Sequence, residues 1–157
     1  MKIKDVMNKD VITCGPDDPL DIVARLFKEN HISGMPVVEN GEVVGLVSET
    51  DLIRLFNFPE FSNELWLPSP FEIIEIPIRN IMRFEETKKA IENMKQRPVK
   101  DIMVRSVYSV SPEDSLEDAS GIMIKHKVNR LPVIENNELV GIVARSDIIR
   151  GLSEMVE

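Results

Sequence analysis

The sequence predicts an α+β fold in which two pseudo-symmetric β-α-β-β-α repeats pack sheet to sheet, with an ordered insertion between them. Three observations predict it. The chain matches itself at a shift of 96 residues, each copy alternates strand-like and helix-like patterns, and the segment between the copies is rich in aromatic residues. The copies are predicted to occupy residues 1–56 and 98–157, and the insertion 57–97.

The duplication is the strongest of these signals. At the shift of 96, residues 4–54 align with residues 100–150 without a gap, and 18 of the paired positions are identical. Many of the other pairs exchange only among apolar residues. A unit of about fifty residues buries too little apolar surface to be stable alone, so the pair is predicted to be the folding unit.

Each copy opens with a short strand and a helix. The strands are predicted at 11–13 and 107–109, and a proline followed by acidic residues marks each helix start. Apolar residues then recur at helical spacing, which indicates one buried face. These residues are Leu20, Val23, Ala24 and Phe27 in the first copy and Leu116, Ala119 and Met123 in the second.

A hairpin and a final helix complete each copy. In the first copy the strands 35–39 and 42–48 flank Asn40-Gly41, a dipeptide that favours a tight turn. Asn136-Asn137 is a weaker version of the same signal. Thr50-Asp51 and Ser146-Asp147 then supply capping side chains, so a final helix is predicted to begin there.

The insertion lacks the Gly and Ser content of a flexible linker and is predicted to be ordered. Residues 71–78 resemble an edge or irregular strand, and residues 83–95 resemble a helix. Two interpretations stay open: the insertion caps the core, or its aromatic residues form a dimer or partner surface. Those aromatic residues are Phe58, Phe61, Trp66, Phe71 and Phe84.

Composition excludes several classes of protein. The net charge of -8, from 19 basic and 27 acidic residues, opposes binding to nucleic acid or to an acidic membrane surface. Neither a signal peptide nor a membrane-spanning stretch is visible, and the single cysteine, Cys14, forms no internal disulfide. A cytoplasmic protein is expected, with Cys14 as a small hydrophobic residue in a strand.

One motif occurs in both copies and carries a family resemblance. Residues 45–51 read Gly, two apolar residues, Ser, two further residues and Asp, and they follow the strand Pro36-Val37-Val38. Residues 141–147 repeat the pattern except that Ala144 replaces the hydroxyl residue. With the duplication and the element order, this motif resembles the CBS domain family, over nearly the whole chain apart from the insertion.

The resemblance implies a regulatory module, involved in signal transduction, that binds AMP, ADP, ATP, S-adenosylmethionine or methylthioadenosine in clefts between the two repeats. This ligand is regulatory, and no cofactor or metal is implied. Stand-alone CBS pairs are often homodimers, and many CBS pairs regulate an enzyme, channel or transporter. A regulated enzyme or transporter is therefore one possible partner.

The resemblance implies that Asp51 and Asp147 bind the ribose hydroxyls. The alternative is that each carboxylate is only a helix cap. It also implies that Arg130 binds the phosphates, with Lys127 beside it. The alternative is that Arg130 and Lys127 are a solvated pair on the surface. Gly34 is the counterpart of Arg130 in the first repeat. We therefore expect phosphorylated ligands to prefer the cleft of the second repeat, formed by Arg130, Lys127 and Asp147.

Apolar strand residues are expected to line the adenine slots. In the first repeat the candidate ligand-binding residues are Val11, Ile12, Thr13, Ile32, Ser33, Gly34, Leu46, Ser48, Thr50 and Asp51. In the second they are Val107, Tyr108, Ser109, Lys127, Val128, Asn129, Arg130, Ile142, Ala144, Arg145, Ser146 and Asp147. His31 and His126 lack metal-ligand spacing and are interpreted as surface residues.

Other function classes have weaker support. No nucleophile-base pair, metal cluster or phosphate-binding Gly-rich loop suggests an enzyme, so no catalytic activity is expected. The main alternative is a structural interaction or dimerisation module whose clefts stay unoccupied. The two hypotheses differ in whether an adenosine ligand raises the melting temperature.

Overall fold

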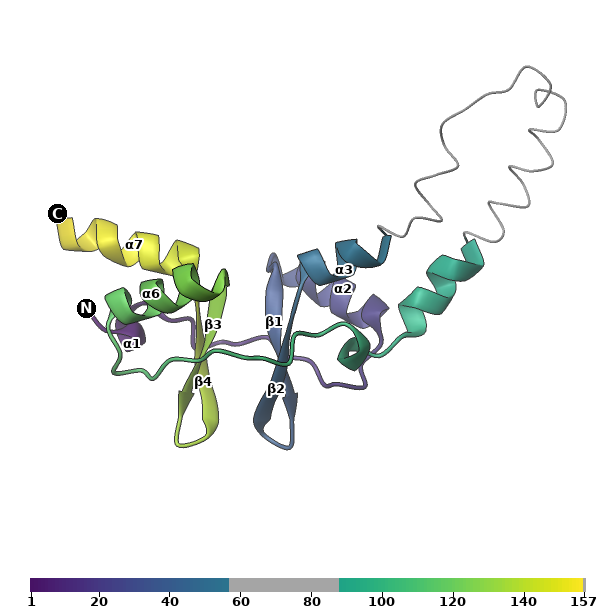
Figure 1. The fold of residues 1–157 in the computed structure, drawn as a ribbon, viewed down its shortest axis with the longest axis horizontal. Coiled ribbons are helices and arrows are strands. Elements are labelled where there is room, and N and C mark those ends of the chain that lie inside the picture. The colour runs from purple at the N-terminus through teal and green to yellow at the C-terminus, as the bar shows by residue number, and fades with distance from the viewer. Residues whose placement is uncertain (57–87, 157) are drawn as a thin grey trace, which may run out of the picture.

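The computed structural model describes residues 1–56 and 88–156, and it consists of two similar halves that lie side by side (Figure 1). In the first repeat the elements are α2 (Leu20–Asn30), β1 (Gly34–Glu39), β2 (Glu42–Ser48) and α3 (Glu49–Phe56). In the second they are α6 (Leu116–His126), β3 (Arg130–Glu135), β4 (Glu138–Ala144) and α7 (Arg145–Val156). Short helical turns precede them, α1 (Ile3–Val6) and η1 (Val99–Asp101).

The two hairpins confirm the predicted repeat. β1 pairs antiparallel with β2, β3 pairs antiparallel with β4, and each register is irregular at the same place, after Val37 and after Val133. Both turn residues are left-handed in each hairpin: φ is 51° and 80° at Asn40 and Gly41, and 52° and 63° at Asn136 and Asn137. Asparagine tolerates this conformation, so the second turn forms without glycine.

The predicted opening strands at 11–13 and 107–109 do not form. The residue after each span makes a single parallel bridge, Cys14 to Val37 and Val110 to Val133. A turn at Gly15, whose amide donates to the Asp18 carboxylate, leads the first segment away from β1. Cys14 is buried as expected, and burial together with the charge of Asp18 raises the pKa of its thiol to about 12.

The final helices begin slightly earlier than predicted, at Glu49 and Arg145. Each aspartate therefore stands at the third helical position rather than at the start. Asp51 Oδ2 accepts a hydrogen bond from the Ser48 amide at 2.9 Å, and Asp147 Oδ2 accepts one from the Ala144 amide at 2.8 Å. This is the returning half of a capping box, in which a side chain one turn into the helix satisfies the amide that precedes it.

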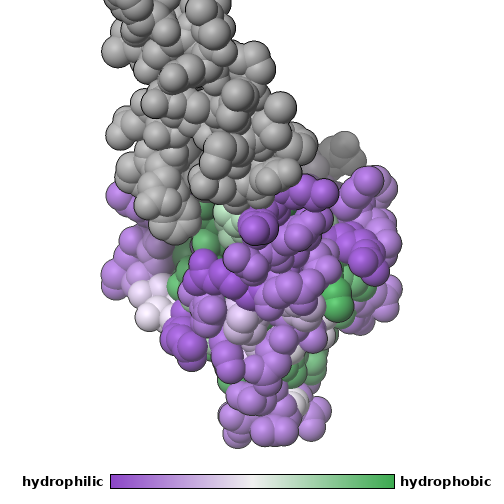
Figure 2. Space-filling view, turned by 90° about the vertical axis from the view of Figure 1, so that its right-hand side faces the viewer, coloured by the Kyte–Doolittle hydropathy of each residue, from purple (hydrophilic) through white to green (hydrophobic). Residues whose placement is uncertain are grey.

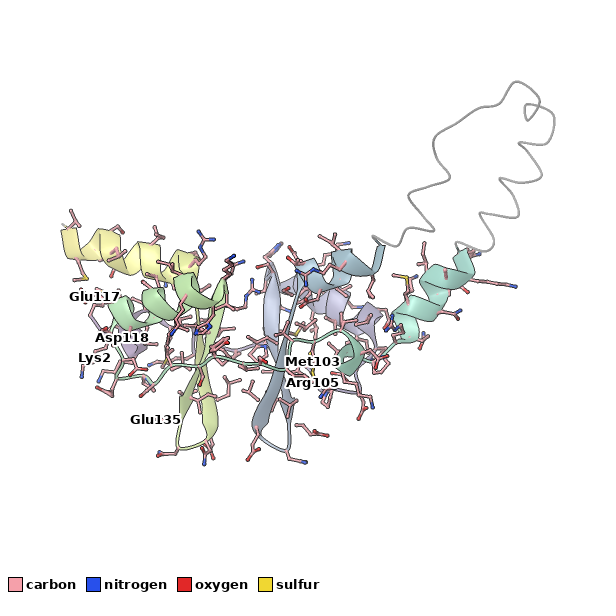
Figure 3. All side chains as sticks on the ribbon, in the orientation of Figure 1. Lys2, Met103, Arg105, Glu117, Asp118 and Glu135 are labelled. Atoms are coloured by element: carbon pink, nitrogen blue, oxygen red, sulfur yellow. The ribbon has the colours of Figure 1, made fainter. Side chains whose placement is uncertain are left out.

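The segment before each repeat packs into the core of the other repeat. Ile3 and Val6 lie in the apolar cluster of the second repeat, and Val99 and Met103 lie in that of the first. In Figure 3, Lys2 accordingly lies beside the second half of the molecule, near Glu117 and Asp118. We call residues 1–8 and 97–104 the lead-in segments. Neither apolar core is complete without the lead-in segment that belongs to the other repeat.

Backbone hydrogen bonds fix the exchanged lead-in segments in place. Asn8 and Ile142 exchange two such bonds, both 2.9 Å, and Val104 and Leu46 exchange two of 2.8 and 2.9 Å. The pairing puts the lead-in backbone directly over Gly45 and Gly141. A Cβ atom at Gly45 would lie 2.6 Å from Sδ of Met103, and one at Gly141 would lie equally close to Met7. Each Cβ atom would also lie 3.1 Å from a carbonyl oxygen of the lead-in backbone, of Val104 or of Asn8, so glycine suits this close approach.

The described part of the insertion covers the first core. Residues 88–96 are helical, which agrees with the end of the predicted helix, and Met94 packs against the first core. An apolar groove of about 270 Å³ lies between this helix, α2 and α3. Figure 2 faces this end of the molecule, where hydrophobic residues reach the surface between hydrophilic areas. The predicted strand 71–78 and the five aromatic residues of the insertion lie outside the described residues.

Among residues 1–56 and 88–156, no helix combines the length and the apolar character that a bilayer span requires.

The exchange predicts that a substitution in one lead-in segment destabilises the whole molecule. Ile3 is fully buried in the second core, so Ile3→Ala should lower the free energy of unfolding by about 2 to 5 kcal/mol. Ile124→Ala is the matched control, because Ile124 is 79% exposed, and it should change the value by no more than about 0.5 kcal/mol. Urea unfolding measures both. Equal effects would show that Ile3 does not complete the core.

Candidate functional site

A cleft of about 410 Å³ lies between the two repeats and is the candidate ligand site. Four segments form it: the start of β1, the end of β2 with the first turn of α3, the extended chain after η1, and the loop from α6 into β3. Its lining residues are Ser33, Leu46, Val47, Ser48, Glu49, Thr50, Asp51, Arg54, Val104, Ser106, Tyr108, Lys127, Val128, Asn129 and Arg130.

Asp51 provides a preorganised carboxylate on one side of the cleft. Its exposed fraction is 9%, and Oδ2 accepts hydrogen bonds from the amide and the hydroxyl of Ser48 at 2.9 and 3.1 Å. Its other oxygen, Oδ1, lies 4.0 Å from Nη1 of Arg54, which is beyond hydrogen-bonding distance. One oxygen of Asp51 therefore holds the helix start, and the second can accept hydrogen bonds from a ligand.

Arg130 reaches the same cleft from the second repeat. Its Nη2 donates to Oγ of Ser33 at 2.6 Å, although the two residues are 97 positions apart in sequence. Burial lowers the pKa of the guanidinium, and the negative charges of Glu49 and Asp51 partly offset this effect. The guanidinium thus carries a positive charge into a partly desolvated site, where it attracts anions more strongly than it would in water.

An aromatic pair forms part of the wall. The rings of Tyr108 and His126 are stacked, with centroids 3.7 Å apart and planes inclined by 17°. His126 belongs to the last turn of α6, so the helix supports the tyrosine ring from behind. Tyr108 lines the cleft together with Leu46 and Val128, and these side chains offer an apolar surface to a flat ring.

The structure corrects the predicted grouping of the charged residues. Arg130 and Lys127 share the cleft with Asp51, not with Asp147 as their common repeat suggested. Pairing a helix start from one repeat with a loop from the other is a tertiary arrangement that sequence order does not reveal. Asp147 has a different environment, because its Oδ1 accepts a hydrogen bond from Arg150 at 3.0 Å, and Arg150 also donates to the carbonyl of Val6.

The predicted adenine slots are also regrouped, since Leu46 faces Val128 and Tyr108 across the repeats. The predicted residues that line the cleft are Ser33, Leu46, Ser48, Thr50, Asp51, Tyr108, Lys127, Val128, Asn129 and Arg130. Those outside its lining are Val11, Ile12, Thr13, Ile32, Gly34, Val107, Ser109, Ile142, Ala144, Arg145, Ser146 and Asp147.

Sequence reasoning missed five lining residues: Val47, Glu49, Arg54, Val104 and Ser106. Two of them belong to the extended chain after η1. Val104 and Ser106 alternate along an extended chain with Met103 and Arg105, which Figure 3 shows beside β2 and which line a separate depression. Alternation of this kind places every second side chain on the same side, as in a strand.

A protein family and a known protein match this chain over most of its length. The model of the CBS domain family matches residues 3–57 and 99–154. An uncharacterized protein of Methanocaldococcus jannaschii is 36% identical over 154 residues, covering 97% of this chain and 91% of that protein.

Two solved structures share the fold. One is CBSX2 in complex with AMP, with a TM-score of 0.70, 24% identity, and coverage of 99% of this chain and 98% of that chain. The other is the CBS domain pair of protein MJ0100 in complex with 5'-methylthioadenosine and S-adenosyl-L-methionine. Its TM-score is 0.69 and its identity 18%, with the same coverage.

Proposed function

Because this chain belongs to the CBS domain family, we propose that it is a regulatory module that senses an adenosine-containing ligand in the cleft between its repeats. The observation that carries the proposal is the placement of Asp51 and Arg130, a buried carboxylate and a partly buried guanidinium from different repeats, in one cleft. The volume of about 410 Å³ lies within the range of small-molecule sites. The ligands named for CBSX2 and the MJ0100 pair support the adenosine class.

Each part of such a ligand has a chemically suitable partner in the cleft. The vicinal hydroxyls of a ribose can donate to the carboxylate of Asp51, whose position is held by Ser48. An adenine ring can lie against the apolar side chains around Tyr108. Phosphate can accept charge-assisted hydrogen bonds from Arg130, with Lys127 adding positive charge. AMP, ADP and ATP are therefore the preferred candidates, ahead of S-adenosylmethionine and methylthioadenosine.

The mechanism of sensing follows from the position of the cleft. A ligand held by Asp51 and Arg130 links the two repeats, and its binding therefore favours the relative orientation in which both contacts are made. A regulated enzyme or transporter that contacts both repeats would respond to that orientation. The protein itself need perform no chemistry on the ligand.

Two alanine variants test the ligand role of Asp51 against a purely structural one. Asp51 and Asp147 cap equivalent helices through equivalent bonds, so each substitution should lower the free energy of unfolding by about 0.5 to 2 kcal/mol. AMP should raise the melting temperature of the parent protein and of Asp147→Ala, but not of Asp51→Ala. Thermal shift with AMP, ADP, ATP, S-adenosylmethionine and methylthioadenosine measures this.

A panel in which no adenosine ligand shifts the melting temperature of the parent protein would contradict the proposal. It would favour the alternative function, a structural interaction or dimerisation module. Loss of the AMP response in Asp147→Ala, with a normal response in Asp51→Ala, would place the working site near Asp147, outside this cleft.

We also propose that the protein is a homodimer. Apolar side chains on the outer helices α3 and α7 are left exposed, and Ile53 and Ile149, which are equivalent in the two repeats, are 65% and 66% exposed. Leu152 and Met155 extend this surface along α7. Apolar side chains at equivalent places in two halves suit a twofold interface, in which each copy presents the same surface.

Light scattering at micromolar concentration should give a mass of twice 17.9 kDa. Ile149→Glu should shift the protein toward monomer, because it places a charge in the interface. Glu154→Gln, a polar substitution on the same helix, serves as the control and should leave the mass unchanged. A monomeric parent protein would rule the dimer out.

A further inference from the structure

Gly34 and Arg130 occupy equivalent positions, as the first residues of β1 and β3. They are also in direct contact across the two repeats. A Cβ atom built on Gly34 would lie 2.1 Å from Nη1, 2.4 Å from Cζ and 2.8 Å from Nε of Arg130. The guanidinium therefore occupies the space that any side chain at position 34 would need.

We propose that Gly34 is a specificity-determining residue: by having no side chain, it lets the Arg130 guanidinium cross into the cleft of Asp51, and so makes this the cleft for phosphorylated adenosine ligands. The inference rests on the function proposed above and deepens it. Gly34 does not line the cleft, and it acts only through Arg130.

The position of Arg130 depends on contacts that are available only where it now lies. Its Nη2 donates to Ser33, the residue before Gly34, and the negative charges of Glu49 and Asp51 favour its cationic form. A methyl group at position 34 would push the guanidinium away from Ser33. The positive charge would then no longer be held at the point where the phosphate of a bound nucleotide is expected.

Gly34→Ala is a selective test because the fold should tolerate it. The backbone of Gly34 is not among those with positive φ, so alanine introduces no backbone strain there. The atoms that it would meet are the far end of a long, flexible side chain, which can move without displacing β3. The expected result is a displaced arginine in an otherwise intact protein.

Isothermal titration calorimetry with AMP and with adenosine tests the proposal on the full chain. Gly34→Ala should weaken AMP binding about tenfold or more, which is the range expected for losing a charge-assisted hydrogen bond. Adenosine binding should change by less than about threefold, because adenosine carries no phosphate. In an Arg130→Ala background, Gly34→Ala should have no further effect on AMP, since both substitutions then remove the same interaction.

Gly121→Ala is the matched control, because a Cβ atom there meets nothing within 4 Å, and it should leave both affinities unchanged. Unchanged AMP binding in Gly34→Ala would overturn the role of Gly34 while leaving the proposed function intact. An equal loss for AMP and adenosine, or an additive loss in the double variant, would also overturn it, because the effect would then not pass through Arg130. A parent protein that binds neither AMP nor adenosine, nor any other ligand of the thermal-shift panel, would refute the proposed function as well.

Discussion

The exchange of lead-in segments is the constraint on which the rest of the structure depends. Val99 and Met103 complete the first core, and Ile3 and Val6 complete the second. Each hairpin also extends its hydrogen bonding onto the lead-in segment of the other repeat, at Leu46 and at Ile142. Neither repeat can therefore bury its apolar surface alone, and the two repeats of one chain form a single folding unit.

This constraint also builds the site. The exchange brings the starts of β1 and β3 together, so the loop that precedes β3 faces the start of α3 in the first repeat. Both the carboxylate of Asp51 and the guanidinium of Arg130 then reach one cleft, although they come from different copies. A ligand held by both residues would favour one relative orientation of the two repeats. That orientation is what a regulatory module needs to control.

The two repeats differ at the equivalent positions that place charged side chains near the cleft. The equivalent positions 34 and 130 meet between the repeats, and the Arg130 guanidinium occupies the space that a side chain at position 34 would need. The aspartates differ as well, since Asp147 Oδ1 accepts a hydrogen bond from Arg150 at 3.0 Å, whereas Asp51 Oδ1 has Arg54 only at 4.0 Å. Duplication thus supplied two similar half-sites, and a few substitutions made them chemically different.

The sequence by itself determined the repeat, the order of the elements, both hairpins and most of the residues that line the cleft. These features depend on local patterns, such as helical spacing around Leu20 or the turn at Asn40-Gly41, which act through neighbouring residues. Only the tertiary structure decided that Arg130 faces Asp51 rather than Asp147, that Val99 belongs to the first core, and that Gly34 leaves space for the Arg130 guanidinium. Each of these contacts joins residues about 80 to 100 positions apart, and local propensity carries no information about such pairs because it is set by neighbours along the chain.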